Sequence, residues 1–535
     1  MSRFRSAPTR PQLLRATSLA LLLGVTPHLA TAQTVWTGGG DITNVFDDGN
    51  WTLSSPGSLG DPMRPDPPLA AITEGAGGSN PVIDAGEQLE ALSFTIRDGA
   101  TTDGQLDLNG FMVSGQTNVG IGGVLNIGQT GELDGPLNVL AAGQATIEGE
   151  ITGAATNAGS TSLVGATGNS SRVLGVLRNE AGGQMTVVGP VSADGGVVNT
   201  GEDPVDSSIP STLTVAAADT VAGTPAGVLT TTTIATNGGA RTVIAGTATA
   251  SGAVTVAGAG GVSGRATALE VTGDLSAGSL AVTNGATASV DGTLTSDVTV
   301  STTGTLTLSG DVAADAGAGI GGTIINEGIV SAGNTAADPA QVAGLMTNQT
   351  GGDLTVRGVL AADGGVTTTG AGSSVVVAAA DAGAGTAAGV LQTTTLTNQT
   401  GGSLQVQDGA SLSGTVMNTG VGATVTVASG GTLTGNLTTD GGATFDLDGT
   451  VDGDVTNAST GPGPITSSAA GTVTGALRTE ANATTFVTGD LAAGSVVVTG
   501  AVGGLPPSLL SLSSGVTLNS ATVSVEAGGA VTVDD

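Results

Sequence analysis

The sequence predicts an all-β protein, a right-handed parallel β-helix with coils of about 20 residues. First, the pattern apolar-x-Gly-x-apolar, in which x is any residue, recurs about every 20 residues. This period is typical of a solenoid. Second, short runs such as "GSLQVQD" and "ATVTVAS" alternate apolar with polar residues and are rich in Val and Thr, as strands are. Third, the apolar spacing of helices is hard to find after residue 32, which excludes leucine-rich and helical repeats.

Residues 1–32 have the features of a secretory signal peptide. An apolar run, "ATSLALLLGV", follows four basic residues, Arg3, Arg5, Arg10 and Arg15. The small residues of "ATAQ" favour cleavage after Ala32, so the sequence predicts an exported protein. His28, the single histidine of the chain, lies in this segment and would be removed with it.

Residues 33–75 contain both tryptophans of the chain, although aromatic residues make up only 1% of the sequence. The ends of a solenoid expose core side chains and strand edges, which a distinct terminal repeat covers. We expect Trp36, Phe46 and Trp51, joined by the turn-forming "TGGGD" and "DDGN", to form this N-terminal cap. The alternative is an aromatic platform that binds a sugar.

Residues 76–535 form the predicted β-helical repeat region. Its glycine units are centred on Gly135, Gly149, Gly273, Gly414, Gly435, Gly453, Gly475 and Gly489. Side chains alternate along a strand, so each glycine shares a face with its apolar neighbours, and a missing inward side chain indicates a corner. The turns "TNAG", "TNGG", "TNQTGG", "MNTG" and "TNGA" place Asn and Gly where left-handed backbone is expected. About 25 coils would make a rod on the order of 120 Å long.

Two blocks near residues 177–240 and 346–402 are duplicates. "NEAGGQMTVVGPVSADGGVVNTG" (179–201) recurs as "NQTGGDLTVRGVLAADGGVTTTG" (348–370), and "VAAADTVAGTPAGVLTTTT" (215–233) recurs as "VAAADAGAGTAAGVLQTTT" (377–395). The two offsets, 169 and 162 residues, differ because the loop that links the two segments is shorter in the second copy.

The composition excludes several function classes. Without the signal peptide, eight Arg oppose 44 Asp and Glu, a net charge of −36 that argues against binding to nucleic acid or anionic membranes. There is no Cys, so the fold has no disulfide. The exported part also lacks His, Lys and Tyr, which rules out Ser-His-Asp, Cys-His and Ser-Lys nucleophile systems and ordinary zinc sites.

Carboxylates are the remaining candidates for chemistry. The densest acidic stretch, "DLDGTVDGD", contains Asp446, Asp448, Asp452 and Asp454. Two carboxylates can form a glycosidase pair, and several can bind calcium, but we interpret these Asp-Gly pairs as corner residues. "DLNG", with Asp107, Asn109 and Gly110, is a weaker indication of a calcium site. We therefore expect no catalytic, cofactor-binding or metal-binding residue, and no enzyme.

An early Trp-x-Gly-Gly element followed by Asn-Trp, formed by Trp36, Gly38, Gly39, Asn50 and Trp51, precedes the degenerate Gly/Thr/Val/Asn repeats. Together with the signal, these features resemble the passenger regions of autotransporters, the type V secretion proteins of Gram-negative outer membranes; filamentous adhesins share the repeats. The family's C-terminal translocator barrel is missing, because the chain has no Tyr for aromatic girdles and ends in repeat-like "GGAVTVDD". We expect the chain to be a fragment whose outer-membrane barrel follows it.

The resemblance implies a surface-exposed or secreted stalk that adheres to a host, a surface or a neighbouring cell. Its expected partner is a receptor or an identical rod. The rival is a polysaccharide lyase or glycosidase on the same fold, which would need a basic or aromatic groove, and the nearest basic pair is Arg172 and Arg178. A third reading is a structural component of a surface layer or biofilm matrix.

Overall fold

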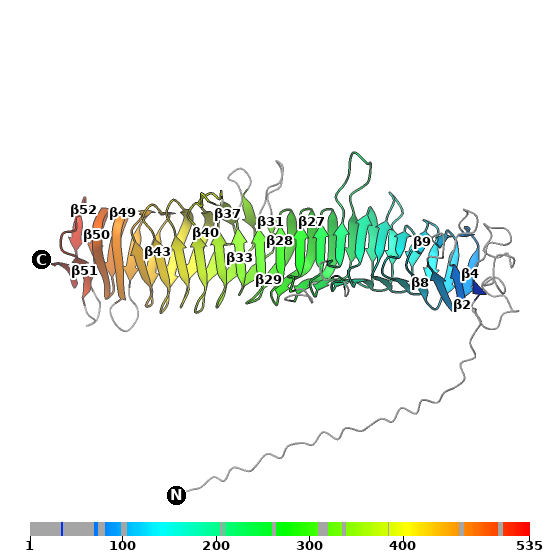
Figure 1. The fold of residues 1–535 in the computed structure, drawn as a ribbon. Coiled ribbons are helices and arrows are strands. Elements are labelled where there is room, and N and C mark those ends of the chain that lie inside the picture. The colour runs from blue at the N-terminus through cyan, green and yellow to red at the C-terminus, as the bar shows by residue number, and fades with distance from the viewer. Residues whose placement is uncertain are drawn as a thin grey trace, which may run out of the picture.

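The structure, a computed structural model, describes residues 34–35, 69–72, 81–97, 104–203, 206, 209–258, 264–308, 319–320, 322–333, 339–383, 385–458, 465–500 and 507–534. These residues form an elongated rod of β-strands and contain no helix (Figure 1). The predicted parallel β-helix is confirmed, with about 19 turns of roughly 21 residues. Since neighbouring strands lie about 4.8 Å apart, the rod is roughly 90 Å long.

Each coil adds one strand to each of three faces, and every strand pairs in parallel with the equivalent strand of the next coil. The first face begins with β3 (Val82–Ile83), β6 (Gln105–Leu108), β9 (Val124–Ile127), β12 (Gln144–Ile147), β15 (Ser160–Val164) and β18 (Gln184–Val188). The second begins with β4 (Gln88–Ala91), β7 (Phe111–Ser114), β10 (Glu132–Asp134), β13 (Glu150–Ile151), β16 (Ser171–Val173) and β19 (Pro190–Ala193). The third continues through β5 (Ser93–Ile96), β8 (Thr117–Val119), β11 (Leu137–Val139), β14 (Ala155–Asn157), β17 (Leu177–Glu180) and β20 (Val197–Thr200).

The same order of faces continues to the C-terminal end, where some strands run through a bend and serve more than one face. These are β25 (Thr247–Ala257), β27 (Asp274–Thr283), β29 (Thr293–Val300), β40 (Val390–Asn398), β42 (Ser411–Thr419), β49 (Ile465–Glu480) and β50 (Ala483–Val498). The last coil consists of β51 (Ser508–Leu512), β52 (Leu518–Ser520) and β53 (Val523–Val525), and β54 (Gly529–Val533) stacks on β51.

The core is a narrow column between the three faces. Side chains alternate inward and outward along each strand, so equivalent inward residues stack directly from coil to coil. One such stack consists of Leu108, Ile127, Ile147 and Leu163, all fully buried or nearly so. Each buried Leu or Ile contributes about 1.5–3 kcal/mol. Aliphatic stacks therefore stabilise the rod without the aromatic residues that the chain lacks.

Glycines form a column at the bend between the second and third faces, as the glycine units predict. A Cβ atom on Gly435 would lie 2.3 Å from the carbonyl oxygen of Gly414, and one on Gly453 would lie 2.3 Å from that of Gly435. No side chain fits where the backbones of successive coils approach so closely. The same unit also marks the corner between the first and second faces, where a Cβ on Gly149 would lie 2.1 Å from Gly131 O.

Asparagines at the end of the third face point into the rod. Asn157 donates through Nδ2 to Oδ1 of Asn179 over 2.7 Å, and Asn179 donates in turn to Asn199 over 3.0 Å. A second ladder contains Asn326 and Asn348, and a third contains Asn398 and Asn418. The expectation of left-handed backbone is right for the glycines of "TNGG", "TNQTGG" and "MNTG", because Gly238, Gly351, Gly401 and Gly420 have positive φ. It is wrong for the asparagines of these turns and of "TNAG", which are strand residues. At "TNGA" it is right, since Asn284 has a φ of 55°.

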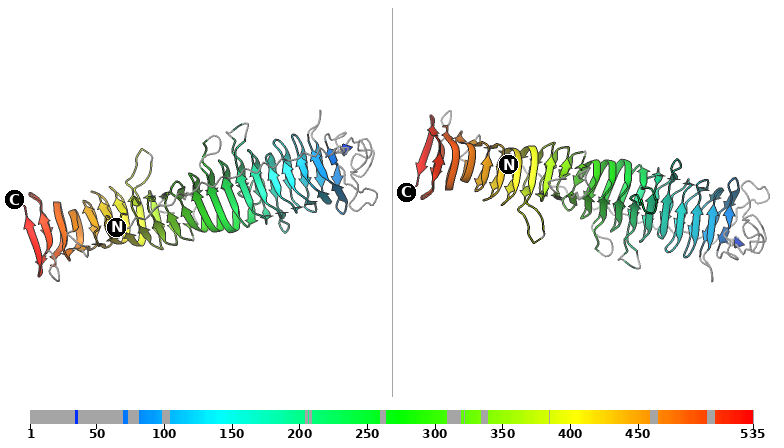
Figure 2. Two further views of the ribbon diagram at one scale, coloured as in Figure 1. Left: turned by 90° about the horizontal axis from the view of Figure 1, so that it is seen from below. Right: turned by 90° about the horizontal axis from the view of Figure 1, so that it is seen from above.

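The duplicated segments form matching hairpins at the corner between the first and second faces. Residues 216–227 connect β21 (Thr212–Val215) to β22 (Val228–Thr231), and residues 378–389 connect β39 (Ser374–Val377) to β40. Asp219 exchanges two backbone hydrogen bonds of 3.0 Å with Thr224, and Asp381 does the same with Thr386. Both hairpins project from the rod, the first in green in Figure 1 and the second in yellow in Figure 2. The rod has about 19 coils, fewer than the predicted 25, and such excursions, which lengthen a coil without adding another, account for part of the difference.

Two short strands fall within residues 33–75. β1 (Thr34–Val35) pairs in parallel with β2 (Leu69–Ile72), and β2 pairs with β5, so both extend the third face. The cap residues Trp36, Phe46 and Trp51 lie outside the described residues, as does the signal segment 1–32 with His28. Among the residues that are described, no helix is long and apolar enough to cross a membrane.

Candidate functional site: a polar groove on the first face

A groove of about 380 Å³ lies near the N-terminal end of the rod, on the first face and its corner with the second. It is lined by Val82, Asp107, Asn109, Asn126, Ile127, Gly128, Thr146 and Glu148. Most of these residues carry oxygen or amide groups, and none is basic or aromatic. The sequence "DLNG", singled out for Asp107 and Asn109, supplies two of them.

Two stacks of outward residues from successive coils form the groove. Parallel pairing aligns Asp107 with Asn126 and Asn126 with Thr146, so these three side chains form the first stack. The second stack lies at the corner, where three backbone N–H groups donate to the preceding coil: Asn109 to Ile83 O, Gly128 to Leu108 O and Glu148 to Ile127 O. The regular winding of the chain thus places residues from three coils side by side.

Gly128, in the middle of the second stack, has no side chain. The carboxamide of Asn109 occupies the space above it, and a Cβ atom on Gly128 would lie 2.2 Å from Asn109 Oδ1. Residues 165–170 form a small excursion two coils further on, and Asn169 Nδ2 reaches back to within 3.4 Å of Gln129 O. This excursion therefore borders the corner side of the groove.

Part of the polar lining is held in place by the protein. Asp107 Oδ1 accepts from Asn126 Nδ2 over 2.7 Å and from Gln105 Nε2 over 2.9 Å. Other groups have no protein partner in the described part of the chain: the Glu148 carboxylate, the Asn109 carboxamide and the Thr146 hydroxyl. The groove combines a fixed edge with several polar groups that are free to bind a ligand.

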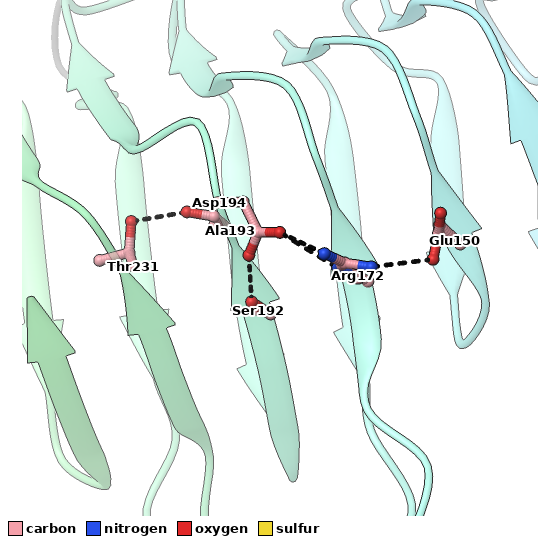
Figure 3. A network of polar contacts seen from close by, with 6 residues as sticks. All are labelled: Glu150, Arg172, Ser192, Ala193, Asp194 and Thr231. Carbon is pink, nitrogen blue, oxygen red and sulfur yellow. Dashed lines mark hydrogen bonds and ion pairs between the residues drawn. The ribbon is translucent and has the colours of Figure 1, made fainter.

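A charged network crosses the neighbouring second face (Figure 3). Arg172 lies 2.7 Å from Asp194 and 3.7 Å from Glu150, and Ser192 donates to Asp194 over 2.5 Å. The hydrogen bond to Asp194 raises the pKa of Arg172. Hydrogen bonds from Ser192 and then Arg172 lower the pKa of Asp194. This arginine is occupied by acids of its own face and offers no free cation to an acidic ligand.

Glu132 lies on the same face, directly beside Glu150 in the parallel register. Burial raises the pKa of Glu132, and the negative charges of Glu150 and Asp134 raise it further. Asp134 in turn accepts a hydrogen bond of 2.6 Å from Thr152 of the next coil. The region around the groove is therefore strongly acidic.

The acidic stretch at 446–454 does not form one site. Asp446 lies outward on the first face in β46 (Thr444–Leu447), whereas Asp452 lies outward on the second face in β47 (Thr450–Asp452). Each carboxylate accepts a hydrogen bond from the next coil: Asp446 from Ser468, Asp452 from Thr474 over 2.8 Å, and Asp454 from the Ala476 N–H over 2.8 Å. Asp448 is the corner residue that precedes Gly449. These acids link neighbouring coils, as corner and surface residues do.

The remaining candidates are also separated. Arg172 belongs to β16 on the second face and Arg178 to β17 on the third, so they do not form a basic pair. Asp107 and Asn109 both line the groove, but Gly110 does not. Gly110 packs against the backbone of the preceding coil, and a Cβ atom on it would lie 2.3 Å from Asp84 O. No group of three or more His, Cys, Asp or Glu residues suited to a metal ion occurs in the part of the chain that the structure describes.

Sequence reasoning missed Asn126, Thr146 and Glu148. They lie 19 to 41 residues from Asp107 and share no motif with it. The available signal was the coil period itself, since residues about 20 apart stack on one face. Coil lengths vary, however, and only the register shows which residues become neighbours.

No family model matches the sequence, and no curated protein matches it. Among solved structures, the chain is similar to a hyper-glycosylated fragment of TibA, whose glycosylation TibC catalysed. The alignment has 15% identity and a TM-score of 0.22, and it covers 80% of this chain and 99% of the other. A likeness this weak indicates no function.

Proposed function

We propose that the chain is a non-enzymatic, autotransporter-like stalk, exposed on the cell surface or secreted, which mediates adhesion or contact between cells and in biofilms. The single observation that carries this proposal is the unbroken stacking of coils into a rod. A rod of this kind holds an adhesive surface at a distance from its anchor, and it presents long faces rather than a deep cleft.

The faces suit contact with other surfaces. Their outward residues are mostly Thr, Ser, Gln, Asn and Asp. Polar side chains in regular rows can form hydrogen bonds with a receptor or with a second rod. The partner is therefore a surface or cell receptor, or an identical chain, and the net negative charge argues against nucleic acid.

The enzymatic alternative has less support. Asp446 and Asp452, for which a glycosidase pair was the alternative to corner residues, lie on different faces and accept hydrogen bonds from the next coil. Arg172 and Arg178 lie on different faces as well. The test is turnover of a carbohydrate panel by the exported chain. Turnover that Asp446→Asn or Arg178→Ala abolishes would establish an enzyme and remove the proposal.

Adhesion is tested with beads that carry residues 33–535. We expect such beads to attach to cells or glass, or to aggregate with one another, more than beads that carry the heat-unfolded chain. Analytical ultracentrifugation of the free chain separates self-association from receptor binding. The proposal would be contradicted if the beads neither attach nor aggregate and if ultracentrifugation shows that the free chain stays monomeric at high concentration.

The proposed location is the surface of a Gram-negative bacterium, reached through an outer-membrane translocator barrel. Support comes from the signal-like segment 1–32 and the resemblance of residues 36–51 to autotransporter passengers. Proteolysis of intact cells tests this location. We expect the protease to cleave the chain on intact cells, and a chain that is cleaved only after lysis would contradict a surface location.

A further inference from the structure

We propose that the polar groove on the first face binds an uncharged carbohydrate, with Asn109 and Glu148 as ligand-binding residues. The inference concerns binding by the isolated chain, so it does not depend on whether the rod acts as an adhesive stalk.

The size and position of the groove suit a small ligand or the end of a larger one. Its volume of about 380 Å³ lies in the range of small-molecule sites, roughly 300–1,000 Å³. It is bounded by four successive coils, and the excursion at residues 165–170 approaches the corner through Asn169 and Gln129. A stacked parallel sheet keeps these parts in fixed positions, which limits the ordering cost of binding.

The free polar groups match hydroxyls. A carboxylate accepts hydrogen bonds, a carboxamide both donates and accepts, and a hydroxyl does either. The Glu148 carboxylate, the Asn109 carboxamide and the Thr146 hydroxyl have these properties and have no protein partner in the described residues. A sugar ring, whose adjacent hydroxyls donate and accept at once, can satisfy all three.

Several acids on the described part of the rod, Glu148, Glu327 and Asp448 among them, accept no hydrogen bond from a neighbouring coil, and of these three only Glu148 lines the groove. Asp353 accepts from Ser374 of the next coil over 2.5 Å, and Asp134 accepts from Thr152 in the same way. These links are the ordinary use of a surface carboxylate in this fold. A carboxylate without such a link, in the lining of the groove, is available to a ligand.

The charge of the region selects against other ligand classes. Glu132 and Glu150 add negative charge nearby, and Arg172 is engaged by Asp194, so an acidic sugar or a phosphate would be repelled. A calcium ion wants six to eight oxygens, whereas one Asp107 oxygen already accepts two side-chain hydrogen bonds. The lining has too few apolar groups for a hydrophobic ligand.

Isothermal titration calorimetry of residues 33–535 with neutral oligosaccharides of glucose, mannose and galactose tests the proposal. We expect at least one to bind, and Glu148→Gln and Asn109→Ala each to weaken it by about tenfold or more. Neither side chain has a protein partner, so both variants should fold, which circular dichroism verifies. Glu327→Gln removes the same charge at a different corner and should bind as the unaltered chain does.

Three results would overturn the inference. The first is no binding of any neutral oligosaccharide at millimolar concentration. The second is binding that both groove variants leave unchanged. The third is binding that EDTA abolishes, or that polygalacturonate competes for more strongly than neutral sugars, because either result replaces the neutral sugar by a metal or an anion. The two proposals are tested separately. The bead assay with Glu148→Gln tests whether the stalk still adheres, and calorimetry alone tests whether the groove binds a sugar.

Discussion

Asn179 connects three coils inside the rod. Its Oδ1 accepts from Asn157, and its Nδ2 lies within 3.0 Å of three oxygens, Gly183 O, Asn199 Oδ1 and Thr212 O. The side chain is fully buried. A buried polar group costs little when it is fully hydrogen-bonded and much when a partner is removed, so the ladder stabilises the rod only as a set.

We expect Asn179→Val to lower the free energy of unfolding by about 1–3 kcal/mol, because it leaves Asn157 and Asn199 without their partner. Valine itself fits, since Val139 occupies the equivalent position of an earlier coil. Urea unfolding followed by circular dichroism measures the change. Replacing Asn157, Asn179 and Asn199 together by Val should cost less than the sum of the three single changes; an additive result would show that the asparagines act independently.

Threonines interrupt the ladder at two equivalent places. Thr439 stands between Asn418 and Asn457 in the register, and Thr368 stands between Asn348 and Asn398. In both places the same two atoms lack a hydrogen-bond partner, the Thr Oγ1 and the Oδ1 of the following Asn. The shorter side chain does not span the distance between coils.

Thr439→Asn should therefore raise the free energy of unfolding by about 1 kcal/mol. The new Oδ1 accepts from Asn418 Nδ2, and the new Nδ2 donates to Asn457 Oδ1, as in the ladder at Asn179. Thr438→Asn, on the solvent side of the same strand, is the matched control and should change stability little. Thermal melting of both variants decides the matter, and equal shifts would refute the ladder explanation.

Glu132 should make stability depend on pH. Its pKa is raised in the folded chain, so the charged form at pH 7 opposes folding, and this penalty disappears as pH falls through the folded pKa. Glu132→Gln should raise the free energy of unfolding at pH 7 by less than about 0.5 kcal/mol, which thermal melting detects as a slightly higher melting temperature. The gain should vanish below about pH 4, near the ordinary pKa of a glutamate. A gain that is the same at both pH values would rule out titration as its cause.

At the scale of the element, the bend glycines carry a steric requirement. Gly453→Ala would place a Cβ 2.3 Å from the Gly435 carbonyl oxygen, and the rigid backbone of the preceding coil cannot move away cheaply. We expect a loss of about 3 kcal/mol or more. Gly409→Ala is the control, because nothing lies within 4 Å of its Cβ position and only its φ of +70° opposes the substitution, at about 1–2 kcal/mol. Equal losses in urea unfolding would contradict a steric role for Gly453.

The elements differ in how far the sequence predicts them. The bend at Gly435 follows from one residue and its two apolar neighbours, so local chemistry predicts it correctly. Asn157 and Asn284 occur in similar "TN" turns, yet one points into the core and the other adopts left-handed backbone. In the register Val282 holds the position equivalent to Asn157, so Asn284 lies two residues further on, in the turn, and a single turn does not reveal this register. The groove around Glu148 was missed for the same reason, since it depends on register between coils.

The whole rod behaves as a stack in which each coil contacts only its neighbours. Solenoids of this kind gain stability from each repeat and from each interface between repeats, so removal of one complete coil leaves two surfaces that still match. Thr432 and Thr450 are equivalent in the register, which makes residues 432–449 one coil. Gly431 and Gly449 occupy the same corner, and a Cβ on Gly449 would lie 2.4 Å from Gly431 O.

Deletion of residues 432–449 should therefore give a folded rod that is one coil, about 4.8 Å, shorter. Thr439 leaves with the deleted coil, so Asn418 becomes the neighbour of Asn457 and can donate to the Oδ1 that lacks a partner in the intact chain. Circular dichroism and small-angle scattering should show unchanged β content and a slightly shorter particle, with cooperative melting retained. Deletion of residues 432–440, half a coil, is the control: it removes the second-face and third-face strands of this coil, so the first-face strand at 424–427 would be followed directly by the next first-face strand at 444–447, and folding should be abolished. If both deletions fold equally well, or neither folds, the coils are not the interchangeable units that the parallel register indicates.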